Sequence, residues 1–356
     1  MTEWRECKLG DVIVLNYGKA LPEKKRVFGN IPVYSSAGLT GYHNESLVNG
    51  RGIIIGRKGT IGSVHFSYKP FWCIDTAYYI TDNEEYNLKY IYYLLQTLGL
   101  NELNEDSAVP GLNRNTAYQQ DISFPPLPEQ KAIAEFLSSL DDKIDLLTKQ
   151  NKTLEDLAQA YFRKWFIEDA SDEWEVGKLG DYIEIHDSKR VPLSKIEREK
   201  MKSGTLYPYY GAATIMDYVN DYIFDGEYIL MGEDGTVETE DGYPVLQYAT
   251  GKFWVNNHAH VLTAKSPFNN YFIWFFLKQC NISGIVTGAV QPKINQENLK
   301  NIDIPIPDLT LINSANQFFA NIFAKILNNL EQIKTFQKLR DTLLPKLISG
   351  EIRLKM

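Results

Sequence analysis

Apolar residues recur at alternating intervals of three and four positions along residues 128–167 and again along residues 308–356. This spacing places them on one face of an α-helix and is typical of a helix that packs along a seam against a second helix. The seam residues are Ile133, Leu137, Leu140, Ile144, Leu147 and Leu154 in the first stretch, and Phe319, Ile322, Ile326, Ile333 and Phe336 in the second. The pattern predicts two long helices, each with a polar interruption in its apolar face, at Asn151 and at Asn329.

The remaining residues, 1–127 and 168–307, show a different pattern. Short runs of β-branched and aromatic residues, such as Gly52-Ile53-Ile54-Ile55-Gly56, lie between glycine and asparagine clusters. Such runs are typical of short strands bounded by turns. We therefore expect two β-rich globular parts, each followed by one of the long helices.

The two globular parts repeat each other in sequence. Trp4 and the segment Leu9-Gly10-Asp11 recur roughly 170 residues later as Trp174 and Leu179-Gly180-Asp181. Further along, Pro32, Tyr34, Gly56, Gly59 and Thr60 match Pro208, Tyr210, Gly232, Gly235 and Thr236. The chain is therefore an internal repeat, with small insertions in the loops of the second copy.

Connectivity predicts how the repeats are arranged. A helix over residues 128–167 carries the chain roughly 50–60 Å at about 1.5 Å per residue, and the second helix can bury its seam only by lying back along the first. The predicted fold is α+β, with similar globular domains at 1–127 and 168–307, separated by long antiparallel helices at 128–167 and 308–356 and related by an approximate two-fold axis. An ordinary amphipathic helix pair packed on a core is the alternative.

Composition restricts the class of protein. The 356-residue chain has a net charge of -8, which argues against binding nucleic acid through overall charge, so any DNA-binding face must be local. Three cysteines without Cys-x-x-Cys spacing favour a reducing cytoplasm over a zinc site or a disulfide framework. The longest apolar run, Tyr271 to Leu277, is far below the ~20 residues that span a bilayer, so we expect a cytoplasmic protein without a membrane partner.

Four segments of the chain resemble the specificity subunits of type I restriction-modification systems. They are Ile53-Ile54-Ile55-Gly56-Arg57-Lys58-Gly59-Thr60-Ile61-Gly62, Phe124-Pro125-Pro126-Leu127-Pro128-Glu129-Gln130, Gly288-Ala289-Val290-Gln291-Pro292-Lys293-Ile294-Asn295 and Leu344-Pro345-Lys346-Leu347-Ile348-Ser349-Gly350. The Pro-Leu-Pro-Glu-Gln helix entry is the most specific of these motifs. The second copy departs from it with Pro307-Asp308-Leu309-Thr310, so its docking surface is expected to differ in detail.

The resemblance implies a division of labour. In that family, two target-recognition domains each read one half of a split, asymmetric site in double-stranded DNA. The helical regions act as a ruler and as the dock for two methyltransferase subunits, through which the restriction and translocation subunits attach. The resemblance also implies that S-adenosylmethionine, ATP and Mg²⁺ serve those partner subunits, and that this chain binds no cofactor itself.

Positions that differ between the matched loops are candidates for reading different half-sites, as Arg57-Lys58 differs from Glu233-Asp234. Arg, Lys, Asn and Gln are the residues that most often contact base edges in the major groove. Candidates in the first domain are Lys24, Lys25, Arg26, Arg57, Lys58, Asn113, Arg114 and Asn115, and in the second they are Lys189, Arg190, Lys252, Asn256, Asn257, Gln291, Lys293 and Asn295. Each of them could instead be a solvated charge or a turn-capping asparagine.

Two groups suggest catalysis or metal binding, and neither is sufficient for it. His258 and His260 would share one face of a strand, but with no carboxylate nearby to complete a ligand set we expect a hydrogen-bonded histidine in the domain interior. The acidic cluster that begins at Glu233 and Asp234 has no matching cluster in the first copy, so we expect a solvated loop. No Asn/Asp-Pro-Pro-Tyr/Phe methyltransferase motif occurs, so catalysis is expected to come from partner subunits.

The preferred interpretation is a non-catalytic DNA-reading subunit. A fused restriction enzyme would need a catalytic carboxylate and lysine set and a methyltransferase motif, and neither is recognised in the sequence. Two alternatives remain open. One is a coiled-coil scaffold that joins two domains without a role in DNA binding, and the other is the specificity module of a related methylation or anti-phage system without a restriction partner.

Overall fold

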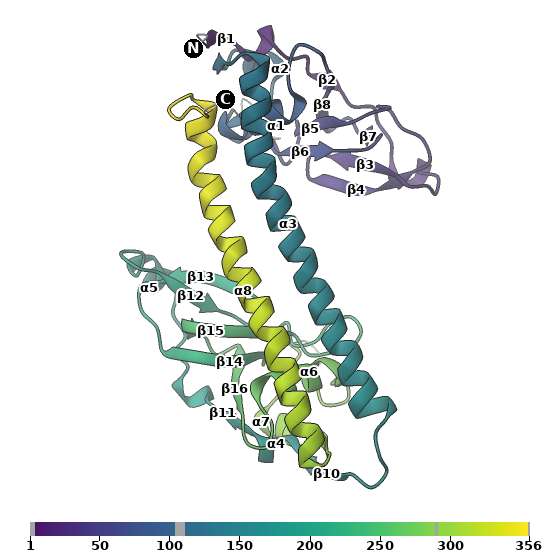
Figure 1. Cartoon of the computed structure of the whole chain (residues 1–356), viewed down its shortest axis with the longest axis vertical. Helices are drawn as coiled ribbons and strands as arrows, with labels where there is room; N and C mark the ends of the chain where they lie inside the picture. The colour runs from purple at the N-terminus through teal and green to yellow at the C-terminus, as the bar shows by residue number, and fades with distance from the viewer. Residues whose placement is uncertain (1–3, 104–110, 289–290, 355–356) are drawn as a thin grey trace. The chain divides into compact units, whose positions relative to one another are not determined.

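The structure is a computed structural model that describes residues 4–103, 111–288 and 291–354. The chain forms two compact units, which we call the N-unit (Met1–Leu147 with Glu331–Met356) and the C-unit (Thr148–Leu330). The long helices α3 (Leu127–Arg163) and α8 (Leu309–Ile348) each contribute part of their length to both units (Figure 1). The predicted α+β class, with two β-rich parts and two long helices, is confirmed.

Small sheets form the globular part of the N-unit. Their strand orders are β2-β8-β5-β6, β4-β3-β7 and β1-β9. The strands are β1 Arg5–Lys8, β2 Asn16–Tyr17, β3 Ile31–Ser35, β4 Gly38–His43, β5 Gly52–Gly56, β6 Val64–Ser67, β7 Trp72–Cys73, β8 Ala77–Thr81 and β9 Asp121–Phe124, and the helices are α1 Leu88–Thr97 and α2 Arg114–Tyr118. Ile53 and Ile55 face the main core, which includes residues of α1 and α3, whereas Ile54 packs with Phe71 in a second cluster. The apolar run of β5 is continuous because both of its faces are buried.

The C-unit gathers its strands into a larger sheet in the order β11-β16-β14-β15-β12-β13, with a separate pair β10-β17. The strands are β10 Glu175–Lys178, β11 Ile183–Ile185, β12 Tyr207–Tyr210, β13 Ile215–Val219, β14 Phe224–Gly232, β15 Leu246–Val255, β16 Ala259–Ala264 and β17 Asp303–Ile306, and the helices are α4 Leu179–Tyr182, α5 Lys195–Lys200, α6 Asn270–Gln279 and α7 Gln296–Lys300. The long strand β15 pairs antiparallel with β14 and parallel with β12. In the N-unit these two pairings are made by separate strands, since β6 pairs with β5 and β7 pairs with β3.

Matching hydrogen bonds show that the repeat seen in the sequence is a repeat of structure. Leu9 N donates to Gln120 O at 2.9 Å, and its counterpart Leu179 N donates to Ile302 O at 2.8 Å. The side chain of Asn87 caps α1, and the side chain of Asn269 caps α6 in the same way. The two globular domains therefore share one backbone plan.

Glycines at matched turns share a left-handed backbone conformation in the two copies. Gly59 follows β5 with φ +78°, and Gly235 follows β14 with φ +79°. Residues with a Cβ atom rarely adopt this left-handed conformation, whereas glycine adopts it readily. Their recurrence in both copies is therefore explained by turn geometry.

Halves of α3 and α8 pack antiparallel in the C-unit. Asn151 contacts Asn329, and further along α3 the ring of Phe162 lies 5.9 Å from that of Phe319, which comes earlier on α8. Phe319 is fully buried, Ile322 and Ile326 are at most 7% exposed, and Leu154 is half-buried. The seam of this half is therefore part of the domain core.

The other halves of the helices pack antiparallel in the N-unit. Asp141 of α3 accepts a hydrogen bond from Arg340 of α8 at 2.9 Å, and Glu129, nearer the start of α3, lies 3.9 Å from Arg353, which follows α8. The seam residues Ile133, Leu137, Leu140 and Leu147 are buried, whereas Ile144, Ile333 and Phe336 are half-buried. Burial is deepest where the helices meet the globular domain.

The Pro-Leu-Pro-Glu-Gln segment has a structural explanation within its own unit. Glu129 is 5% exposed and accepts a hydrogen bond from the indole of Trp4 at 2.8 Å. Gln130 is 1% exposed, donates to Pro125 O and accepts from the backbone of Asn87, the residue that caps α1. In the C-unit, which lacks the motif, the capping residue Asn269 is held by Asn316 instead.

Candidate nucleic-acid interface

Two arginines of the first domain converge on one tyrosine. The guanidinium carbons of Arg57 and Arg114 each lie 5.0 Å from the centroid of the Tyr17 ring. Both distances are within the ~6 Å range of a cation–π interaction. Arg57 also donates to Asp75 O at 3.1 Å, and Tyr17 is 48% exposed. The cluster is therefore anchored at its base and open to solvent.

The backbone around this cluster is fixed by strand pairing and by two hydrogen bonds. Tyr17 of β2 pairs in register with Tyr78 of β8, and their rings lie 5.1 Å apart. The buried Tyr78 hydroxyl donates to Leu112 O at 3.0 Å, and Leu112 N donates to Arg57 O at 2.8 Å. Burial raises the pKa of Tyr78, so its hydroxyl stays a neutral donor. These contacts bring four distant segments together.

Other candidates of the first domain lie around the cluster or apart from it. Lys58 is exposed and its backbone bridges to Gly111, while Asn113 caps α2 through its side chain and Asn115 is exposed. Lys24 and Lys25 are exposed on a short 3₁₀ turn, Glu23–Lys25. Arg26 is half-buried and donates to Thr40 O at 2.6 Å. Arg26 is thus held by the backbone, whereas both lysines are free to reach a phosphate.

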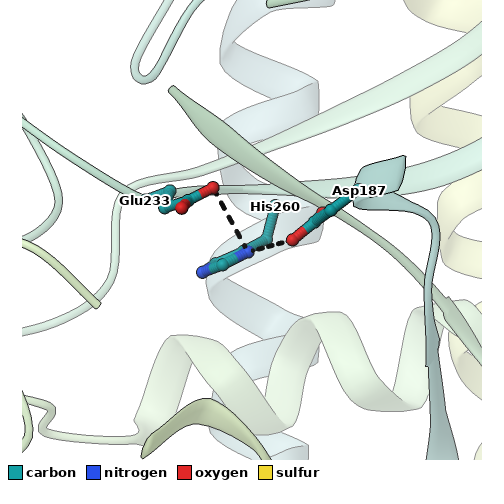
Figure 2. A group of neighbouring side chains, drawn as sticks. All are labelled: Asp187, Glu233 and His260. Carbon is teal, nitrogen blue, oxygen red and sulfur yellow. Dashed lines mark hydrogen bonds and ion pairs between the residues drawn. The ribbon is translucent and has the colours of Figure 1, made fainter. Parts of the chain in front are cut away.

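The second domain has the same backbone frame with different side chains. His260 Nε2 lies 2.9 Å from Ile294 O, much as the Tyr78 hydroxyl lies 3.0 Å from Leu112 O, and Ile294 N donates to Glu233 O at 2.9 Å. Four positions of this frame differ between the domains: Tyr17 is matched by Asp187, Arg57 by Glu233, Tyr78 by His260 and Arg114 by Gln296. We call these matched positions the quartet. Figure 2 shows three members of the second quartet, with Asp187 and Glu233 beside His260.

The second quartet is closed by internal bonds. His260 Nδ1 lies 2.6 Å from Asp187 Oδ2, and Gln296 donates to the same oxygen at 2.7 Å. Because Nδ1 faces a carboxylate and Nε2 faces a carbonyl, His260 can donate to both only as an imidazolium. Arg190 donates to Glu233 Oε2 at 2.5 Å and to Ala259 O at 2.6 Å, and it is 11% exposed.

The pKa of Asp187 reflects this network. Burial acts to raise the pKa of its carboxyl group. The hydrogen bond and charge of His260, the N–H of Val261 and the charge of Arg190 outweigh burial and lower the pKa below its usual value. The carboxylate is therefore a charged, fully engaged member of the interior.

Asp187, Glu233 and His260 have ligand atoms within 4.8 Å of one another, which is close enough for a metal ion. Arg190, however, already supplies a positive charge there, since its guanidinium bonds Glu233 and lies 3.5 Å from Asp187. Lys293 adds another at 3.4 Å from Glu233. A metal would have to displace Arg190, so the geometry favours an internal ion-pair network.

Two sequence predictions about this region are corrected or refined. Carboxylates do lie beside His260, because Asp187 and Glu233 come from distant segments, although the expected buried, hydrogen-bonded histidine is confirmed. Glu233 and Asp234 are not solvated: their side chains are 14% and 17% exposed, and Asp234 pairs with His258.

The remaining candidates of the second domain are mostly exposed. Lys189, Asn257, Gln291, Lys293 and Asn295 are exposed, and the side chain of Asn295 caps α7. Asn256 is 4% exposed and accepts from His258 N, which makes it a turn cap. The hydrogen bond with Tyr222 raises the pKa of Lys252, whose ammonium lies 4.3 Å from that ring. Ala289 and Val290, part of the motif that precedes Gln291, lie outside the described residues.

Sequence reasoning missed Tyr17, Tyr78, Asp187 and Gln296 as members of the site. None is a typical base-reading residue apart from Gln296, and they are far apart in the chain. The signal that could have found them is alignment of the two copies, since each stands opposite a chemically different residue in a matched segment.

The chain belongs to the family described as the type I restriction modification DNA specificity domain, whose model matches residues 1–156 and 171–342. It is therefore a non-catalytic specificity subunit of a type I system, and the family implies recognition of DNA sequence. Among the residues that the structure describes, none of the helices is both long and apolar enough to cross a membrane.

The chain is similar to the type I restriction enzyme MjaIX specificity subunit of Methanocaldococcus jannaschii, with 28% identity over 346 residues that cover 85% of this chain and 78% of that protein. It is 37% identical over 150 residues to a putative type I restriction enzyme specificity subunit of Haemophilus influenzae, which covers 42% of this chain and 37% of that protein. The solved S subunit of the type I restriction-modification system from M. genitalium has the same fold, with a TM-score of 0.66, 19% identity, and coverage of 99% of this chain and 96% of that one.

Proposed function

We propose that this chain reads a bipartite, asymmetric site in double-stranded DNA, with one half-site for each globular domain. The observation that carries the proposal is the quartet: one backbone frame occurs in both domains, and it holds two guanidinium groups against an exposed tyrosine in the first and a closed acidic network in the second. Domains with a shared plan and different chemistry at matched positions are suited to reading different sequences.

The same proposal assigns the chemistry to partners. Two methyltransferase subunits would dock on the helical regions, and restriction subunits would attach through them. S-adenosylmethionine, ATP and Mg²⁺ would be bound by those subunits and none by this chain. The cytoplasm, where the DNA and these partners are found, is the proposed location.

The test is a domain exchange read by methylome sequencing. Residues 1–127 are replaced by the matching domain of another family member, and the chimera is expressed with its methyltransferase partner in cells that lack the original gene. The expected result is a hybrid recognition sequence in which one half changes and the other is retained. The reciprocal exchange of residues 168–307 is the matched control and should change the other half only.

Two outcomes would contradict the proposal. A recognition sequence in which both halves change together would refute one reader for each half-site. Absence of sequence-specific methylation with the unaltered chain would favour the scaffold alternative. A split site that is methylated without restriction of unmodified DNA would identify a methylation system without a restriction partner.

A further inference from the structure

Among the residues that the structure describes, the Tyr17 cluster lacks an acidic partner, unlike several other arginine sites of the protein. Among the described residues, no carboxylate oxygen lies within the 4.0 Å ion-pair distance of Arg57 or Arg114. In contrast, Arg190, Arg198 and Arg340 pair with Glu233, Asp217 and Asp141. The Nε atom of Arg114 is moreover buried without a hydrogen-bond partner.

Two unneutralised guanidinium groups on one ring repel each other, and the arrangement is stable only because the aromatic face and the backbone hold them. A ligand that presents several hydrogen-bond acceptors, and no donors, to Arg57 and Arg114 would relieve this repulsion. Guanine presents O6 and N7 as adjacent acceptors in the major groove, and a guanidinium binds them bidentately. A backbone phosphate offers acceptor oxygens too, but carries no sequence information.

We propose that Arg57 and Arg114 are the specificity-determining residues of the first domain, that they read guanine in its half-site, and that Tyr17 is the positioning residue that holds both guanidinium groups. This inference rests on the proposed function and goes beyond it by naming the base and the residues. In the second domain the position matched to Arg57 is Glu233, which pairs with Arg190, and the position matched to Arg114 is Gln296, which donates to Asp187, so the guanine contact belongs to the first half-site alone.

Tyr17 is well placed for this role because its own position does not depend on the arginines. It pairs through the backbone of β2 with β8, and its ring packs edge-on against the buried ring of Tyr78. Losing the Tyr17 ring would leave the strands in place while removing the surface against which both guanidinium groups lie. A rigid platform of this kind reduces the entropy lost when long side chains contact a base.

The experiment uses the full chain in complex with its methyltransferase subunits. The recognition sequence is first found from genomic methylation, and binding is then measured to duplexes in which each base pair is changed one at a time. Arg57→Ala and Arg114→Ala should each lower affinity for the intact site on the order of 10- to 100-fold and abolish discrimination at one G·C pair of the first half-site. Discrimination in the second half-site should stay unchanged.

Conservative and matched variants separate base reading from charge and from folding. Arg57→Lys keeps the charge and loses the bidentate geometry, so it should bind non-specific DNA normally and still fail to discriminate at that pair. Tyr17→Phe keeps the ring and should behave as the unaltered chain, whereas Tyr17→Leu should lose discrimination at the same pairs as the arginine variants. Lys24→Ala, an exposed cation of the same domain, is the control for loss of charge alone.

Several results would overturn the inference. Uniform weakening on all duplexes with a shallower salt dependence, and rescue by Arg57→Lys, would show phosphate contacts instead of base reading. Unchanged discrimination in the arginine variants would remove the role altogether, as would equal effects of Tyr17→Phe and Tyr17→Leu. Failure of the unaltered complex to prefer any sequence would instead refute the proposed function.

Discussion

The buried asparagine pair between α3 and α8 gives a sharp prediction about the helix seam of the C-unit. Asn329 is fully buried and Asn151 is 7% exposed. Asn329 Nδ2 donates to Asn151 Oδ1 at 2.7 Å and to Gln150 Oε1 at 2.9 Å, and Asn151 Nδ2 donates to Ile326 O at 3.4 Å. We consider replacing one or both asparagines by leucine.

The single replacements should lower the free energy of unfolding, whereas the double replacement should leave it unchanged or raise it. Asn329→Leu removes both donated bonds and leaves the buried Asn151 carbonyl without its donor, so it should lower the free energy of unfolding by ~1–3 kcal/mol. Asn151→Leu leaves one N–H of the Asn329 amide without its acceptor while the bond to Gln150 remains, so it should also be destabilising, by no more than Asn329→Leu. The double variant removes both polar groups from an apolar seam and should be neutral or stabilising.

Chemical denaturation of the full chain and its three variants, analysed as a double-mutant cycle, measures this coupling. We expect an interaction energy of roughly 0.5–3 kcal/mol between the two positions. If the double variant were destabilised by the full sum of the single effects, the asparagines would be acting independently and the pair would not be a hydrogen-bonded unit. Unchanged stability in both single variants would show that neither side chain is desolvated.

The double variant also tests why a polar pair is kept in the seam. A single buried asparagine position can specify the register of packed helices at a cost in stability. Amide hydrogen exchange along residues 148–163 and 309–330 should therefore show a less uniform pattern of protection in the double leucine variant, even where its denaturation midpoint rises. A pattern identical to that of the unaltered chain would refute a role in register.

Two further predictions concern the C-unit. Phe319 is fully buried against Phe162 and Phe275, so Phe319→Ala should lower stability by ~3–5 kcal/mol, whereas Leu309→Ala at an exposed position of the same helix should change it by less than about 0.5 kcal/mol. A hydrogen bond from Lys202 lowers the pKa of Asp217 to about 2. Burial acts to raise this pKa, and hydrogen bonds from Tyr218 N–H and Arg198 act with Lys202 to lower it. Because this pKa lies below the unfolded value of about 4, the stability it contributes is present above that pH and is lost as the pH falls toward 2, so Asp217→Asn should flatten the acid limb of a denaturation midpoint measured against pH.

The repeat and the helices could be predicted from sequence because their signals are local or periodic. Heptad spacing identified the seam from Ile133 to Phe336, and recurrence of glycines such as Gly59 and Gly235 identified matched turns. The same reasoning located Arg57 and Arg114 as candidates from residue type alone. It gave no reason to connect them, because their meeting point is Tyr17, in a two-residue strand far from both.

The second domain was harder to predict because its acidic residues, which look solvent-exposed in the sequence, are enclosed by partners in the fold. Glu233 and Asp234 read as a solvated loop in the sequence, yet they are enclosed by Arg190 and His258. Sequence patterns report which residues are polar but not which of them find partners across a fold. Glu129 and Gln130 show the same effect, since charged and amide side chains at a helix start are buried by bonds to Trp4 and Asn87.

The quartet also indicates how specificity can vary on a constant frame. Two of the bonds that fix its geometry, Leu112 N to Arg57 O and Ile294 N to Glu233 O, involve only backbone atoms. A third bond, at the carbonyl of Leu112 or Ile294, comes from a side chain that differs between the domains, Tyr78 or His260. In the second domain, however, Glu233 is balanced by Arg190. A single exchange of Glu233→Arg would place a second guanidinium beside Arg190 and remove one of the two carboxylates beside His260. Residues of the first quartet can therefore replace those of the second only if all four are exchanged together and Arg190 is changed as well.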